Sequence, residues 1–224
     1  MITSIAGKSC FIYGKTGSPV LYWSVAAQEV ETAARMAALL RAQAGEQWLL
    51  VAFPVEDWGR ELSPWQAPAP SGGEMFGGEG SKTLAWLTEH GMPFVCENYG
   101  AQHLPHFIGG YSLAGLFSLW ACYESPALAG AASCSGSLWY PGWEEYCAAR
   151  RFSRPMYLSL GRKEPLTRNS IMASVGSSTQ KQFDRVQREG EAPTAFVWHP
   201  GGHFHQPTER MAEGFVWLLR HKSQ

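Results

Sequence analysis

The chain has 224 residues, of which 45% are hydrophobic and 17% charged, and its 18 Lys and Arg residues nearly balance its 19 Asp and Glu residues. This length and composition suffice to bury a core, so we expect one domain spanning residues 1–224 rather than a disordered chain. A net charge of −1 provides no electrostatic footprint for nucleic acid or for an anionic membrane surface.

No targeting segment or disulfide pattern stands out. Residues 1–8 lack the basic and apolar regions of a secretory signal, and the apolar stretch 107–123 is too short and too rich in Gly and Ser for a transmembrane helix. The five cysteines are scattered without a C-x-x-C pair, which argues against a disulfide framework and for a reducing compartment. We therefore expect a soluble, cytoplasmic protein that binds neither membranes nor nucleic acid.

The first elements along the chain are strand-like. Residues 10–13 and 20–23 are short, rich in aromatic and β-branched residues and separated by glycines, so they predict an antiparallel hairpin. Apolar residues at helical spacing over 30–40 predict a helix that ends near Gly45. The continuous apolar run 48–53 predicts a strand that is buried on both faces.

The middle of the chain changes character. Residues 59–80 are rich in Gly and Pro and predict a long loop, which is either functional or a surface insertion. Residues 81–99 begin with a helical pattern that is interrupted near Pro93. After this point strands and helices alternate regularly, with strands predicted at 106–108, 130–134, 156–160 and 194–198, and helices from 114, over 143–150, over 177–189 and after an N-cap at Thr208. Such alternation predicts an α/β fold with a mostly parallel sheet covered on both faces.

The sharpest local motif is Gly110-Tyr-Ser112-Leu-Ala114-Gly115, at the junction of a predicted strand and a predicted helix. A nucleophilic serine in such a turn has a strained backbone and needs small residues two positions away on either side, which Gly110 and Ala114 provide. The strict pattern has glycine in place of Ala114. The free N–H groups of the following helix would stabilise a developing negative charge. Ser112 is therefore the candidate nucleophile, and a serine in an ordinary tight turn is the alternative.

A nucleophile elbow is followed along the chain by an acid and then by a histidine. His203, just after the final predicted strand, is the candidate base, and His199 and His205 are its close competitors. Glu164, three residues after Gly161 at the end of another strand, is the candidate acid that would orient the imidazole.

Other interpretations of the charged residues stay open. Asp184 and Glu191 are alternative acids, although their predicted positions suit an exposed surface, and Glu164 itself could form weak surface pairs. The histidines at 103, 106, 199, 203 and 205 do not match a zinc-binding spacing. We therefore expect neither a metal nor a cofactor.

Three segments together, residues 108–115, 159–164 and 201–204, resemble the "putative esterase" branch of the α/β-hydrolases, which includes esterase D, feruloyl esterases and enterochelin-esterase-like proteins. Residues 56–58 and 63–65 are similar to the family's loop after the third strand. The resemblance implies an α/β-hydrolase fold with a mostly parallel central sheet, an antiparallel N-terminal hairpin, helices on both faces and no large lid domain.

The resemblance also implies a serine hydrolase that cleaves carboxylic esters of small molecules through an acyl-enzyme. Carried over to this chain, Ser112 is the nucleophile, His203 the base and Glu164 the acid. The oxyanion hole would use the backbone N–H groups of Leu113 and of a residue near Trp58.

The predicted rim of the site bears the aromatic residues Trp58, Trp65, Trp139 and Tyr140. Of these, Trp65, Trp139 and Tyr140 are the candidates for substrate binding. Packing in the core is the alternative role for such residues. Two other functions remain open from sequence alone. An acyltransferase would use the same residues with an alcohol in place of water, and a non-catalytic protein of this fold would bind a ligand or partner.

Overall fold

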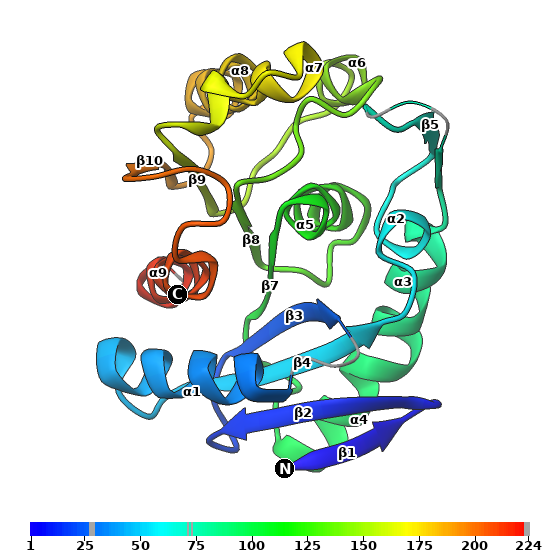
Figure 1. The fold of residues 1–224 in the computed structure, drawn as a ribbon. Helices are drawn as coiled ribbons and strands as arrows, with labels where there is room; N and C mark the ends of the chain where they lie inside the picture. Colours follow the sequence, from blue (N-terminus) through cyan, green and yellow to red (C-terminus); the bar gives the residue numbers. More distant parts are fainter. Residues whose placement is uncertain (27–29, 71, 73, 222–224) are drawn as a thin grey trace.

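The computed structural model describes residues 1–26, 30–70, 72 and 74–221. At its centre is an eight-stranded sheet in the order β1-β2-β4-β3-β7-β8-β9-β10 (Figure 1). Neighbouring strands from β4 to β10 are parallel, and β2 is antiparallel to both β1 and β4. The predicted α/β class, mostly parallel sheet and antiparallel start are thus confirmed. The strands are β1 (Ile2–Ile5), β2 (Lys8–Gly14), β3 (Val20–Ala26), β4 (Leu49–Val55), β7 (His106–Tyr111), β8 (Gly130–Cys134), β9 (Met156–Gly161) and β10 (Thr194–His199).

The N-terminal hairpin does not pair the two strands that the sequence suggested. β1 pairs with β2, whereas β3, the expected partner of β2, is separated from it by β4. The cause lies in β4, because residues 49–53 are all buried and a strand of this kind needs a neighbour on each side. At Gly14 a Cβ atom would lie 2.1 Å from the carbonyl oxygen of Trp48, so glycine is required for β4 to begin there.

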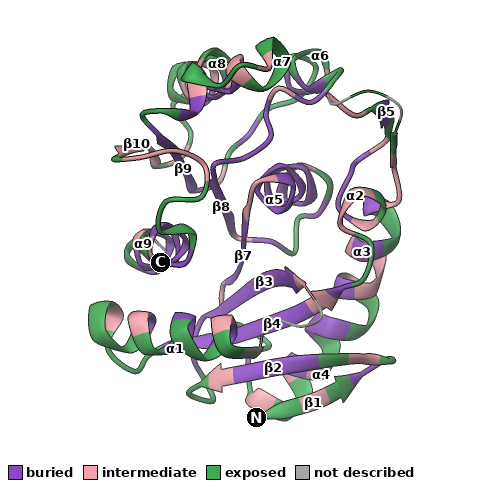
Figure 2. Ribbon diagram, in the orientation of Figure 1, coloured by how far each residue is buried: buried purple, intermediate pink, exposed green. Residues whose placement is uncertain are grey.

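Helices cover both faces of the sheet, and Figure 2 shows that their inner sides are buried. On one face α1 and α9 contribute Met36, Leu40 and Phe215 to a shared core. On the other face α5 is buried along most of its length and packs with α4, α6 and α8. No part of the described chain forms a separate lid domain over the sheet. The helices are α1 (Val30–Ala44), α3 (Gly80–Trp86), α4 (Met92–Tyr99), α5 (Leu113–Glu124), α6 (Trp143–Ala148), α7 (Ser170–Ala173), α8 (Val175–Glu189) and α9 (Pro207–Arg220).

The segment predicted as a long loop contains regular structure. It begins with the short helix α2 (Trp58–Glu61), in which the Asp57 side chain accepts a hydrogen bond from the Arg60 N–H, and continues with β5 (Gln66–Pro68) paired to β6 (Met75–Gly77). The local Gly and Pro content marks the turns between these elements rather than their absence.

The helical segment that follows is widened rather than interrupted. Between α3 and α4, residues 87–91 form a π-helical turn, in which the Met92 N–H donates to the Leu87 carbonyl. This wider turn carries the chain past Pro93, which has no N–H to donate.

The predicted N-cap of the last helix is also wrong. Pro207 is the first residue of α9 and Gln206 precedes it with a positive φ of 50°, while Thr208 is buried within the first turn. Proline favours this first position because its missing N–H would have no acceptor there.

Within the described ranges, no helix combines the length and the apolar character that a membrane crossing needs.

Candidate active site

Ser112 lies between β7 and α5, at a turn whose backbone is strained. Its φ and ψ are 59° and −123°, values that side-chain-bearing residues rarely adopt. At Gly110 a Cβ atom would lie 2.1 Å from the carbonyl oxygen of Ala114, so the backbone on either side of the serine comes too close for a larger residue. The Ser112 hydroxyl does not cap α5. The turn therefore holds a serine whose hydroxyl is not used for the local structure.

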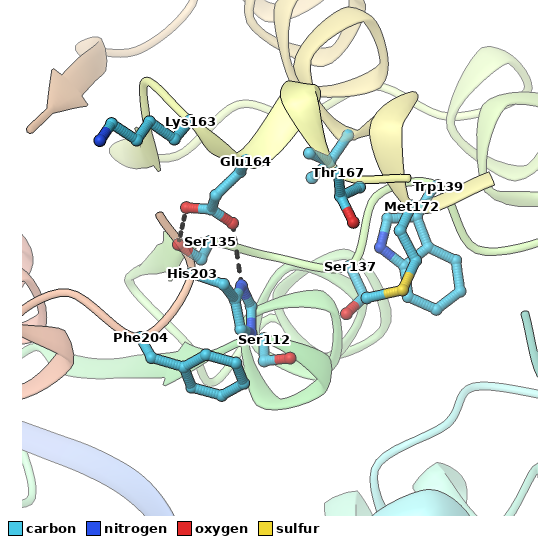
Figure 3. A pocket seen from close by; sticks show the side chains of 11 residues that line it. Ser112, Ser135, Ser137, Trp139, Lys163, Glu164, Thr167, Met172, His203 and Phe204 are labelled. Carbon is cyan, nitrogen blue, oxygen red and sulfur yellow. Dashed lines mark hydrogen bonds and ion pairs between the residues drawn. The ribbon is translucent and has the colours of Figure 1, made fainter. Parts of the chain in front are cut away.

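His203 and Glu164 form a hydrogen-bonded pair beside this turn. His203 Nδ1 lies 2.8 Å from Glu164 Oε2, and a dashed line in Figure 3 marks this contact. Because an ionised carboxylate can only accept, Nδ1 carries the proton and Nε2 is left as the acceptor. No hydrogen bond joins Ser112 to His203 among the described residues, and bonds of this kind are often long in structures without substrate.

Glu164 is buried but is held in its ionised form. Burial alone would raise its pKa, yet hydrogen bonds from His203, from the Ser135 hydroxyl at 2.5 Å and from the Gly161 N–H at 2.6 Å together lower the pKa below its ordinary value. Its two oxygens divide these contacts. Oε1 accepts from Ser135 and Gly161, and Oε2 is left for the imidazole. The pair can thus stabilise a positive charge on His203.

Two cavities meet at Ser112, His203 and Phe204. The first has a volume of about 290 Å³ and is bounded on its other sides by Ser135, Ser137, Trp139, Lys163, Glu164, Thr167, Met172 and Val175. The second, of about 320 Å³, is bounded by Trp23, Ser24, Thr32, Trp58, Tyr111, Pro207, Thr208 and Met211. Both volumes lie at the small end of the range for ligand pockets. A molecule with a reactive centre at Ser112 could place one arm in each cavity.

The structure brings some of the predicted rim residues to the cavities and not others. Trp139 borders the first cavity and Trp58 the second. Trp65 and Tyr140 pack edge to face, with ring centroids 5.7 Å apart, and the Tyr140 hydroxyl donates to the Trp65 carbonyl. Neither of them borders either of these two cavities. Leu113 is the first residue of α5, where backbone N–H groups have no acceptor within the helix.

The loop that bears Trp58 follows the fourth strand rather than the third. The sequence pattern did not predict β1, so every later strand was counted one too early. In α/β-hydrolases the second oxyanion-hole donor comes from the connection between the third strand and the first helix. That connection follows Ala26, the last residue of β3, and Ser24 within β3 borders the second cavity.

The competing histidines and acids border neither of the two cavities at Ser112. His199 ends β10 with Nε2 3.7 Å from the Glu213 carboxylate, and burial lowers its pKa. Asp184 accepts a hydrogen bond from Gln180 on an exposed helix face, and Glu191 pairs with Arg151. Among the residues that the structure describes, no group of three or more His, Cys, Asp or Glu side chains is arranged to hold a metal ion.

Sequence reasoning did not identify the residues behind the His–Glu pair. Tyr111, Ser135 and the buried Arg210 all contact one another and Glu164 or His203. The sequence offered one signal for this group. Arg210 is a charged residue in the last helix, and its helix neighbours Met211, Ala212 and Phe215 are apolar and buried.

The comparison with protein families decides the assignment. The family model described as "Putative esterase" matches residues 11–200. The chain belongs to this family. The esterase is accordingly a carboxylic ester hydrolase. None of the curated proteins compared with it gives a significant match.

Solved structures agree with this esterase in fold. An IroE-like serine hydrolase from Shewanella oneidensis is 15% identical, with a TM-score of 0.78 over 95% of this chain and 76% of that chain. The siderophore hydrolase EstA from Aspergillus nidulans is 16% identical, with a TM-score of 0.77 over 96% and 91% of the two chains. An S-formylglutathione hydrolase from Agrobacterium tumefaciens is 13% identical, with a TM-score of 0.60 over 96% and 90%.

Proposed function

We propose that this esterase cleaves its substrate through a covalent acyl-enzyme on Ser112, with His203 as the general base and Glu164 as the acid that orients it. The observation that carries the proposal is the strained Ser112 turn at a cavity shared with a His203–Glu164 pair at 2.8 Å. A histidine whose Nδ1–H is fixed by a buried carboxylate presents Nε2 as a base.

The reaction follows in two halves. Ser112 Oγ attacks the ester carbonyl carbon while His203 Nε2 takes the hydroxyl proton, and the tetrahedral intermediate then expels the alcohol, which receives that proton. In the second half His203 takes a proton from water while the water oxygen attacks the acyl carbon. Ser112 Oγ then leaves, takes that proton back from His203, and the carboxylic acid is released. Glu164 stays ionised throughout and stabilises the imidazolium.

Negative charge on the carbonyl oxygen would be met by backbone N–H groups. The Leu113 N–H at the start of α5 supplies one donor, and the carboxyl end of β3 is the place for the second. Trp58 has a different role in this proposal, because its position after β4 makes it part of the wall of the second cavity. The two cavities would then hold the acyl and alcohol sides of a small ester.

The test is hydrolysis of p-nitrophenyl esters, from acetate to longer acyl chains, by wild type, Ser112→Ala and Ser177→Ala. Ser177 is an exposed serine on α8 and serves as the matched control. We expect activity to disappear in Ser112→Ala and to persist in Ser177→Ala. Wild-type activity that survives in Ser112→Ala would contradict the assignment of the nucleophile.

Covalent labelling by a fluorophosphonate distinguishes the remaining functions, since the probe reacts with an activated serine whatever the natural substrate is. Labelling that depends on Ser112 supports the proposal even when these esters are poor substrates. Absence of both labelling and turnover would instead favour a non-catalytic binding protein. Product analysis with an added acceptor alcohol separates hydrolysis from acyl transfer.

A further inference from the structure

Arg210 is a charged side chain in the core that the proposed mechanism does not use. It lies on α9 and is only 1% exposed, which places it among the largest fully buried side chains of the protein. A buried guanidinium is costly unless it is paired and hydrogen-bonded, so its partners reveal what it does.

The two terminal nitrogens of Arg210 form a fork toward the candidate active site. Nη2 donates to the Ser135 hydroxyl at 2.6 Å, and Nη1 donates to the Tyr111 hydroxyl at 2.7 Å. Both nitrogens also lie 3.4 Å from Oε1 of Glu164, the carboxylate that pairs with this arginine. The guanidinium further sits over the Tyr111 ring, 5.2 Å from its centroid.

Each hydroxyl has one proton, and the contacts determine where it goes. Because Arg210 can only donate, Ser135 and Tyr111 accept from it and must send their own protons elsewhere. Ser135 Oγ lies 2.5 Å from Glu164 Oε1, and Tyr111 Oη lies 2.5 Å from the backbone carbonyl of His203. One arm of the fork therefore ends on the candidate acid and the other on the backbone of the candidate base.

We propose that Arg210 is a positioning residue, which holds Glu164 and His203 in place relative to each other through its hydrogen bonds to Ser135 and Tyr111. This inference rests on the proposed function, since it assigns Arg210 a role through those two residues and not through contact with substrate. By occupying Oε1, directly and through Ser135, Arg210 leaves Oε2 as the oxygen that faces the imidazole. By fixing Tyr111, it restrains the loop between β10 and α9 on which His203 lies.

The experiment compares Arg210→Met, Arg210→Lys, Tyr111→Phe and the double variant Arg210→Met/Tyr111→Phe in p-nitrophenyl ester hydrolysis. We expect Arg210→Met to lower kcat roughly 10- to 100-fold with KM close to wild type. Arg210→Lys should recover part of kcat, because one ammonium keeps the charge but cannot serve both hydroxyls. Tyr111→Phe alone should lower kcat. In the double variant it should lower kcat little further, because Arg210→Met has already removed the hydrogen bond to Tyr111.

Leu218→Ala is the matched control, because Leu218 is also fully buried on α9 but packs near Gly130, at the opposite end of the sheet from Ser112. It should lower the melting temperature and leave kcat and KM unchanged. A folded Arg210→Met with wild-type kcat would overturn the proposal. If that variant does not fold, an unchanged kcat in Tyr111→Phe would overturn it. Ser112→Ala is measured in parallel. If Ser112→Ala stays active, the proposed function itself has failed, whereas an inactive Ser112→Ala leaves a negative result for Arg210 as a failure of the Arg210 proposal alone.

Discussion

At the scale of single residues, the proposed chemistry depends on the negative charge of Glu164 rather than on its shape. Glu164→Gln keeps the size of the side chain but offers a neutral amide to His203, so the imidazole loses both its preferred tautomer and its counter-charge. We expect kcat to fall roughly 10²- to 10⁴-fold, as when the acid of a Ser-His-Asp triad is neutralised. Steady-state hydrolysis of a p-nitrophenyl ester measures this change. Asp184→Asn, at an exposed acid on α8, is the control and should leave kcat unchanged.

Trp139 provides a prediction about selectivity, because its indole borders the first cavity while Trp65 does not. Trp139→Ala would enlarge that cavity and shift preference toward longer substituents, by about 1–3 kcal/mol in relative kcat/KM per methylene accommodated. The measurement is kcat/KM over an acyl series with a fixed alcohol and an alcohol series with a fixed acyl group. One series should change in Trp139→Ala and neither in Trp65→Phe. The opposite pattern would place the binding surface at Trp65.

Candidate site residues could be predicted from the sequence where their position follows directly from a strand. Ser112, Glu164 and His203 each follow a strand that its apolar pattern predicts, and the carboxyl ends of parallel strands meet at one edge of a sheet. Arg210 could not be assigned in this way. Its partners Tyr111 and Ser135 are distant in the chain, and only tertiary packing of α9 against β7 and β8 brings them together.

At the scale of elements, the turn between β7 and α5 is specified by close backbone approach. Gly110→Ala would push a Cβ atom against the Ala114 carbonyl, which is backbone and cannot rotate away. We expect a loss of stability of about 1–3 kcal/mol together with a loss of activity, because the Ser112 turn must shift. Urea denaturation and ester hydrolysis measure the two effects. Gly59→Ala, where a Cβ atom would meet nothing closer than 3.7 Å, should change neither.

Strand order was harder to predict than strand positions. The apolar run of β4 indicates a central strand, but nothing local says that β4 inserts between β2 and β3. β1 was not predicted, because its run of apolar residues is short and Ile2 and Ser4 are exposed at the edge of the sheet. Without β1, the loop after β4, near Trp58, was counted as the loop after the third strand. A missed edge strand thus changes which loop a family pattern is matched to.

At the scale of the whole molecule, burial of ionised groups links the site to the stability of the fold. The pKa of Glu164 is lowered in the folded protein, because hydrogen bonds from His203, Ser135 and the Gly161 N–H outweigh the opposing effect of burial. The folded state therefore binds fewer protons than the unfolded state just below the ordinary pKa of 4.5. Glu213 behaves in the opposite way, because burial raises its pKa more than Arg210 lowers it.

These two shifts predict opposite changes in acid stability. The Glu164 contribution is fully present above its ordinary pKa and is lost as pH falls through its lower folded pKa, so Glu164→Gln should flatten the decline in unfolding free energy below about pH 4.5. The Glu213 carboxylate is disfavoured in the folded state, so stability is lost as pH rises from 4.5 through its higher folded pKa, and Glu213→Gln should remove that loss. Urea denaturation between about pH 3 and 7 measures both slopes, because this window spans the carboxyl titrations. A Glu164→Gln profile parallel to wild type across this range would show that Glu164 is no better stabilised as an anion in the folded state than in the unfolded chain.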